Sequence, residues 1–194
     1  AILSSIAFHT RVTTDDVYMQ GIRNVSAIDI EQARELGMKV KLLAVGRNTP
    51  AGVDVRVHPT MIPADHQLAA VNGAMNAVYM VGDAVGETMF YGAGAGAFPT
   101  ASAVVGDILE LARPLCQGDD LTAESEPYAK VLPIRPIDDL STRYYIRLAL
   151  EDRAGALAPA ISAFEQAGVS LSSVRDVQCG GDGKRGVVLL TNRA

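Results

Sequence analysis

The most constraining feature of this sequence is a strand-like segment that ends in alternating glycines and enters a helical pattern. The glycines are Gly92, Gly94 and Gly96, and Pro99 and Thr100 then open an apolar run with helical spacing. Because glycine has no Cβ, a ligand can approach its main-chain N–H groups, and the following helix N-terminus favours an anion. The spacing itself favours a tight strand-to-helix turn, because the run is not the G-x-G-x-x-G motif of dinucleotide sites.

Alternating side chains upstream of this turn predict a first hairpin. Residues 38–46 alternate apolar side chains with Lys39 and Lys41, and residues 53–58 alternate valines with polar side chains. This period of two is typical of strands with one solvated face, and the two strands are expected to pair in antiparallel fashion. We expect Lys39 and Lys41 to lie on the solvated face and to have no catalytic role.

A second hairpin is predicted around the turn signal Gly82-Asp83, with strands over about residues 75–81 and 84–91. Four strands with one polar face predict an open antiparallel or mixed sheet backed by helices. The fold class expected from the sequence is therefore α+β.

One helix is predicted between Ser26 and Gly37. Ser26 is a typical N-cap residue, and Gly37 is a natural stop after the last turn. Ile30, Ala33 and Leu36 fall roughly on one face, which we expect to be the buried face.

A second helix is predicted over residues 100–112, directly after the glycine run. Its apolar side chains recur with helical spacing, and we expect Asp107 and Glu110 to face the solvent. The hydroxyls of Thr100 and Ser102 are candidates to bind an anionic group at the helix N-terminus.

Composition excludes several classes of function. The net charge is −5 and no block of basic residues occurs, which argues against nucleic acid and against an anionic membrane surface as partners. No apolar run reaches the ~18 residues of a membrane span, and residues 1–7 lack the basic region of a signal peptide. We expect a cytoplasmic protein.

The potential metal ligands are scattered along the chain. Cys116 and Cys179 are far apart, and His58 and His66 each stand beside turn residues. No third ligand follows at a useful spacing, so we expect no metal site, reduced thiols and structural roles for both histidines.

The second half of the chain changes character. Residues 114–141 are rich in proline, glycine and acidic residues, and we interpret them as a linker between a domain of residues 1–113 and a unit of residues 142–194. In the last unit we expect a strand, then a helix over residues 156–167, and then two strands joined by a turn at residues 180–183.

Three motifs of the first domain resemble the homoserine dehydrogenase family. They are, in order, SIAFHTRVTTDDVYMQGIRNVSAIDI, HPTMIPADHQLAAVNGAMNAV and GDAVGETMFYGAGAGAFPTASAVVGDI. The resemblance implies NAD or NADP as cofactor, L-homoserine and L-aspartate 4-semialdehyde as substrates, and a homo-oligomer. It also implies that Gly92, Gly94, Gly96 and Thr100 lie beside the cofactor.

In that family the nucleotide domain, the catalytic lysine and the substrate-binding acids precede the region that matches here. We therefore assign no catalytic residue to this chain. The sequence opens without a methionine, on residues typical of the middle of a helix, so we expect an internal fragment that is inactive alone.

The last unit resembles the ACT regulatory domain, a ferredoxin-like fold, of which it has the first β-α-β-β part. The matching residues are Leu148, Asp152, Gly155 and Leu157, whereas Ala154 stands where the family has proline. The resemblance implies that Asp152, Gly155 and Ala156 bind an amino-acid effector such as threonine. The simpler alternative is that this loop only caps the helix.

Three functions are compatible with these observations. The first is part of a homoserine dehydrogenase, and the second is a non-catalytic module that binds an amino acid and dimerises. The third is a structural oligomerisation domain that binds neither cofactor nor amino acid.

Overall fold

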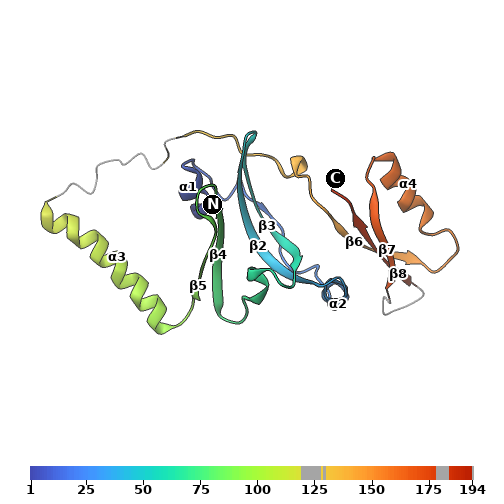
Figure 1. The fold of residues 1–194 in the computed structure, drawn as a ribbon, viewed down its shortest axis with the longest axis horizontal. Coiled ribbons are helices and arrows are strands. Elements are labelled where there is room, and N and C mark those ends of the chain that lie inside the picture. Colours follow the sequence, from blue (N-terminus) through green and yellow to red (C-terminus); the bar gives the residue numbers. More distant parts are fainter. Residues whose placement is uncertain (119–127, 129, 178–183, 194) are drawn as a thin grey trace.

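The computed structural model describes residues 1–118, 128, 130–177 and 184–193 as an α+β chain with several small sheets (Figure 1). Among the described helices, none combines the length and the low charge needed to cross a membrane. The helices are α1 (Ile2–Phe8), α2 (Ala27–Glu35), η1 (Gln67–Ala70), α3 (Ala97–Gln117), η2 (Ile137–Asp139) and α4 (Ala158–Gln166), with η marking 3-10 helices.

The first sheet is built on a long antiparallel hairpin of β2 (Met38–Thr49) and β3 (Gly52–Pro63). The two strands pair along their whole length, from Met38 opposite Pro63 to Thr49 opposite Gly52. A short β1 (Tyr18–Met19) adds to the other side of β3 in parallel. The predicted first hairpin is confirmed, and both of its strands are longer than the alternation indicated. The expected solvated face is wrong for β3, where Asp54 and Arg56 are buried.

The second hairpin, β4 (Met75–Gly82) and β5 (Gly86–Ala93), is also confirmed but forms a separate two-stranded sheet. The prediction of one open sheet from all four strands is therefore wrong. The segment that contains η1 intervenes between β3 and β4, and its backbone binds lysine side chains of β2.

Helix α2 begins as predicted at Ser26, which forms a reciprocal capping box with Asp29, and Gly37 follows it with a φ of 70°. The expected buried face is confirmed at Ala33 and wrong at Ile30. Ile30 is 57% exposed, whereas Asp29, Gln32 and Ala33 are buried. The reason is that the inward face of α2 meets polar partners from the last sheet, described below.

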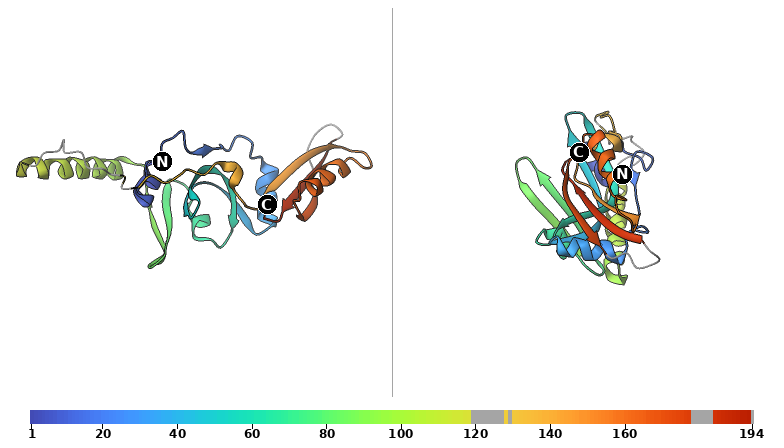
Figure 2. Two further views of the ribbon diagram at one scale, coloured as in Figure 1. Left: turned by 90° about the horizontal axis from the view of Figure 1, so that it is seen from above. Right: turned by 90° about the vertical axis from the view of Figure 1, so that its right-hand side faces the viewer.

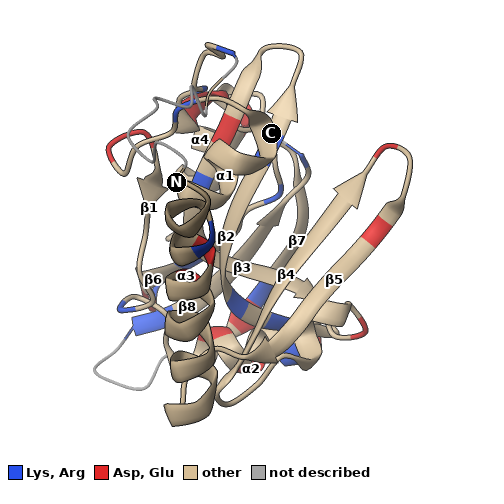
Figure 3. Cartoon of the chain, turned by 90° about the vertical axis from the view of Figure 1, so that its left-hand side faces the viewer, with Lys and Arg blue, Asp and Glu red and all other residues tan. Residues whose placement is uncertain are grey.

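Helix α3 begins three residues earlier and ends five residues later than predicted, at Ala97 and Gln117. Figures 1 and 2 show it extending away from the sheets, and none of its residues is buried. Within residues 97–117 only Asp107, Glu110 and Arg113 are charged, and most of the helix is uncharged in Figure 3.

The last unit has the predicted strand, helix, strand, strand order. Its strands β6 (Tyr145–Glu151), β7 (Leu171–Val177) and β8 (Lys184–Thr191) form an antiparallel sheet in the order β6-β8-β7. The central strand β8 carries the buried side chains Val187, Val188 and Leu189. The predicted turn at residues 180–183 lies outside the described residues, as does Cys179.

The first unit has a small core of Val12, Val53 and Val55, on which part of the predicted linker packs. Val53 donates a backbone hydrogen bond to Pro133 O and accepts one from Arg135 N, each 2.8 Å long. The side chains of Leu132 and Ile134 contact the same core. The chain that follows α3 thus returns to the β2–β3 hairpin before it enters the last unit.

We expect Val53→Ala to lower the free energy of unfolding by about 2 kcal/mol, because the side chain is fully buried and the change leaves a cavity. Chemical denaturation measures the difference. Val81→Ala is the matched control, since Val81 is 71% exposed and its truncation should cost little. Equal losses for the two variants would contradict this assignment of the core.

Candidate functional site

The three glycines of the sequence motif lie at the junction of β5 and α3, and they meet different constraints. Gly96 is the N-cap of α3 with a φ of 122°, a conformation that L side chains rarely adopt. A Cβ added to Gly94 would lie 2.0 Å from Asn76 Nδ2. A Cβ at Gly92 would meet nothing within 4 Å. Gly96 is thus required by the backbone conformation of the turn, whereas Gly94 packs against the exposed Asn76 side chain and Gly92 borders open space.

The N-terminus of α3 is open. No side chain caps it, and Phe98 and Thr100 on its first turn are exposed. Thr100 N donates to Gly96 O over 3.1 Å, so the uncommitted donors of this turn are those before Pro99, which has no N–H. Such donors fit an anionic or amide group, and Thr100 can add its hydroxyl.

A polar cavity of about 290 Å³ lies between η1 and the β4–β5 hairpin. His66 and Tyr79 face each other there with ring centroids 5.1 Å apart. His66 Nδ1 accepts a hydrogen bond from Leu68 N over 3.1 Å, which leaves Nε2 as the N–H of the neutral ring. The cavity is lined by Pro63, Asp65, His66, Gln67, Tyr79 and Glu87.

This cavity can donate and accept hydrogen bonds to a small polar ligand. Partial burial and the neighbouring Glu87 carboxylate raise the pKa of Tyr79, so its hydroxyl stays protonated. Sequence reasoning assigned His66 a structural role and missed Asp65, Tyr79 and Glu87. These residues come together only when the second hairpin folds against η1.

Lys39 and Lys41 hold the segment that carries His66. Lys39 Nζ donates to Ala69 O over 3.2 Å, and Lys41 Nζ donates to Val71 O over 2.5 Å and to Asn72 Oδ1 over 3.1 Å. The predicted solvated face is confirmed for Lys39, which is exposed, whereas Lys41 is half-buried and both ammonium groups have carbonyl partners. Lys39 binds a backbone carbonyl within η1, and Lys41 binds one just after it. Carbonyl groups at the end of a helix have no hydrogen-bond partner within that helix.

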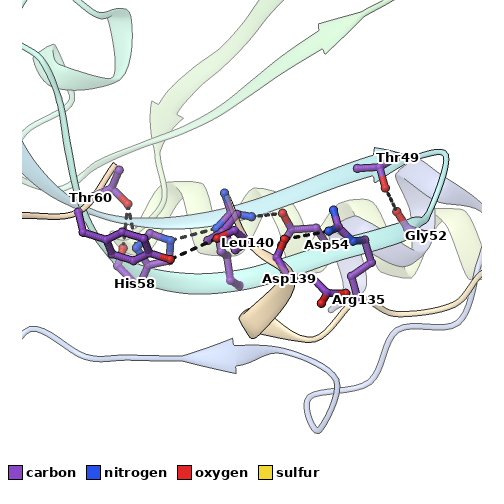
Figure 4. Close-up of polar contacts among 10 residues, drawn as sticks. Thr49, Gly52, Asp54, His58, Thr60, Arg135, Asp139 and Leu140 are labelled. Atoms are coloured by element: carbon purple, nitrogen blue, oxygen red, sulfur yellow. Dashed lines mark hydrogen bonds and ion pairs between the residues drawn. The ribbon is translucent and has the colours of Figure 1, made fainter. Parts of the chain in front are cut away.

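Figure 4 shows a row of polar side chains along one face of β3. Arg56 Nη1 donates to the Asp54 carboxylate, and Arg56 Nε donates to His58 Nε2 over 3.0 Å. His58 Nδ1 lies 2.9 Å from Pro59 O, to which it can then only donate. Both ring nitrogens of His58 are thus occupied, which fits the structural role expected for it.

The described residues contain no group of three histidine, cysteine or acidic side chains that could hold a metal ion.

The predicted effector residues Asp152, Gly155 and Ala156 line a second cavity, of about 260 Å³. Arg185 of β8 also lines it, a residue that sequence reasoning missed because it lies about 30 positions away in the chain. The helix itself begins at Ala158, two residues later than predicted. Ala156 N accordingly donates to Arg153 O over 3.3 Å within the turn.

A buried carboxylate joins the first unit to the last one. Asp29 Oδ1 accepts hydrogen bonds from Tyr145 Oη (2.8 Å) and Arg147 Nε (2.7 Å), and Oδ2 accepts from Ser26 N and Oγ (both 2.8 Å). Burial raises the pKa of Asp29, but the hydrogen bonds from Arg147, Ser26 and Tyr145 outweigh it and lower the pKa to about 2.

The family model described as homoserine dehydrogenase matches residues 1–109. The chain belongs to the homoserine dehydrogenase family. The resemblance found in the sequence motifs is thereby confirmed. Residues 92–100, with the glycine turn and the open end of α3, lie within the matched region.

Curated relatives share this assignment over the whole chain. A homoserine dehydrogenase of Corynebacterium glutamicum is 46% identical over 199 residues, which cover 100% of this chain and 44% of the relative. One of Mycobacterium tuberculosis is 46% identical over 180 residues, covering 90% of this chain and 40% of the relative. The chain therefore spans less than half the length of these relatives.

Solved structures agree. A homoserine dehydrogenase from Thiobacillus denitrificans superposes with a TM-score of 0.85 at 36% identity, over 100% of this chain and 44% of that one. A Staphylococcus aureus homoserine dehydrogenase gives a TM-score of 0.65 at 30% identity, over 100% of this chain and 45% of that one.

We expect Asp29→Asn to lower the free energy of unfolding by about 2 kcal/mol at neutral pH. The folded-state pKa is depressed from 3.8 to about 2, so the stabilisation is present above pH 3.8 and is lost as the pH falls toward 2. Denaturant titrations of both proteins across this range measure the difference. Asp107→Asn on the exposed helix α3 is the control, and a pH-independent effect of Asp29→Asn would contradict the assignment.

Proposed function

We propose that this chain is part of a cytoplasmic, NAD(P)-dependent homoserine dehydrogenase that interconverts L-homoserine and L-aspartate 4-semialdehyde. The observation that carries the proposal is the family match over residues 1–109, which includes the open N-terminus of α3. The cofactor supplies hydride transfer when it is bound.

The proposed role of residues 92–100 is to form one wall of the cofactor site. The uncapped main-chain N–H groups at the start of α3 bind an anionic or amide group, and Thr100 contributes its hydroxyl. The open space at Gly92 lets the cofactor approach the backbone. We assign the proton transfer and substrate binding to residues upstream of the matched region, where the family resemblance places the catalytic lysine and the substrate-binding acids. The part of the chain that the structure describes holds no β-α-β unit of the dinucleotide-binding type.

The test is homoserine oxidation followed through cofactor absorbance. We expect no turnover by this chain alone and turnover by a chain extended upstream through the nucleotide-binding region. If the extended protein is inactive with both NAD and NADP, the dehydrogenase proposal fails.

We expect Gly96→Ala to weaken cofactor binding by the active, extended protein about tenfold or more. L side chains rarely adopt a φ of 122°, so the added Cβ strains the N-cap and displaces the turn that aims α3. Gly106→Ala in the same helix is the matched control. Its Cβ meets nothing within 4 Å, and alanine stabilises a helix interior by up to about 1 kcal/mol.

The measurement is cofactor affinity from fluorescence titration, together with the melting temperature of each variant. Equal affinity of Gly96→Ala and Gly106→Ala would show that the glycine turn has no part in the cofactor site.

A second proposal is regulatory. The cavity of Asp152, Gly155, Ala156 and Arg185 has the size and polarity to bind an amino acid, and the β-α-β-β order supports an ACT-like unit. The cationic Arg185 already pairs with Asp176 over 2.6 Å, which fixes it at the cavity wall. Calorimetric titration of L-threonine into the wild type and Asp152→Ala tests this proposal.

We also propose a homo-oligomer. The β4–β5 hairpin exposes large apolar side chains, among them Val78, Met80 and Phe90 on one face. Sedimentation measurements of the extended protein decide this point.

A further inference from the structure

Helix α2 lies between the β2–β3 hairpin and the β6-β8-β7 sheet (Figures 1 and 2). It presents the buried Asp29 carboxylate to the last sheet, while Ile30 is 57% exposed. The contact between the two parts of the chain here relies on charge and hydrogen bonds. Contacts of this kind are directional, so they fix one relative orientation of the two surfaces.

The contact is centred on one carboxylate. Oδ1 of Asp29 binds Tyr145 and Arg147 of β6, and Oδ2 completes the capping box with Ser26. The Asp29 side chain is 10% exposed and that of Arg147 is 28% exposed. A second, looser pair joins Glu35 at the other end of α2 to Arg175 of β7, over 4.0 Å.

Strand β6 connects this contact to the proposed effector cavity. Tyr145 and Arg147 lie in its first half, and Leu150 and Glu151 at its far end line the cavity. At about 3.3 Å per residue, Arg147 and Asp152 are about 17 Å apart along the chain. The strand pairs with β8 along its whole length, so it moves as one element.

On its other side, α2 is fixed to the first hairpin. Gly37, which follows the helix, accepts a hydrogen bond from Ala64 N over 2.9 Å, and β2 begins at the next residue. Lys39 and Lys41 of β2 in turn hold η1, which borders the cavity of His66 and Tyr79. A movement of α2 therefore also moves the β2–β3 hairpin, which supports this cavity.

We propose that the contact of Asp29 with Tyr145 and Arg147 is the joint through which the last unit docks on α2 and transmits effector binding to the β2–β3 hairpin. The docking part stands on the contacts above. The transmission part rests on the proposed effector function of the Asp152 loop.

The docking part is tested on the 194-residue chain without ligand. Arg147→Met removes the guanidinium and keeps a long side chain, and hydrogen–deuterium exchange then reports on residues 27–36. We expect about tenfold or faster exchange in α2, because charge-assisted hydrogen bonds are lost from a buried carboxylate. Arg34→Met is the matched control, since the Arg34 side chain is 78% exposed and pairs with Glu31 on the outer face of the same helix.

The two variants give a clear decision. Faster exchange in Arg147→Met but not in Arg34→Met supports the joint, provided that α4 and β8 remain protected, which shows that the last unit is still folded. Exchange in α2 that matches the wild type in Arg147→Met overturns the proposal.

The transmission part uses L-threonine as the probe in the same experiment, with D-threonine as control. We expect protection of residues 150–157 in both wild type and Arg147→Met, and a change in α2 and residues 64–72 only in the wild type. An equal change in α2 in both proteins overturns the joint. If L-threonine protects residues 150–157 in neither protein, transmission is overturned together with the effector function, whereas docking is judged by the ligand-free experiment.

Discussion

The structure depends on the register of the β2–β3 hairpin. Continuous pairing from Met38 and Pro63 to Thr49 and Gly52 fixes which side chains of β3 face each way. Val53 and Val55 then form the core with α1 and the returning segment around Ile134, while Asp54 and Arg56 form a buried ion pair on the opposite face. A shift of one residue would exchange these faces and place the charged pair in the core.

The same hairpin also connects to α2 and holds the segment between β3 and β4. Its β2 strand starts where α2 ends, and its lysines hold the segment that leads to the second hairpin. Asp29 shows how local and distant structure share one group, because the carboxylate that caps α2 also binds two side chains of the last sheet. Folding of the helix and docking of the last unit are therefore coupled through a single side chain.

Elements that depend on neighbouring residues could be predicted from the sequence. The cap at Ser26, both hairpins and the order of helix and strands along the last unit follow from turn chemistry and from alternation. Features that depend on distant partners could not be predicted. Tyr145 and Arg147, the partners of Asp29 in the last sheet, lie more than 110 residues away. Helical spacing alone therefore placed Ile30 inside and missed the polar contact.

In the candidate site, too, features set by neighbouring residues could be predicted and features set by distant residues could not. The alternating glycines predicted the glycine turn, and the structure shows that its backbone conformation requires glycine at Gly96. The cavity of His66 and Tyr79 was not visible, because its two sides come from separate segments that carry no shared motif.

The exposed apolar face of α3 has a consequence for how the isolated chain behaves in solution. The chain carries a net charge of −5 at pH 7 and has a pI near 5.1, so electrostatic repulsion between molecules vanishes in mildly acidic buffer. Side chains such as Phe98, Ile108 and Leu115 are then free to bring molecules together. The colloidal stability of the purified chain should fall steeply near pH 5, and its preparation calls for neutral or alkaline buffer.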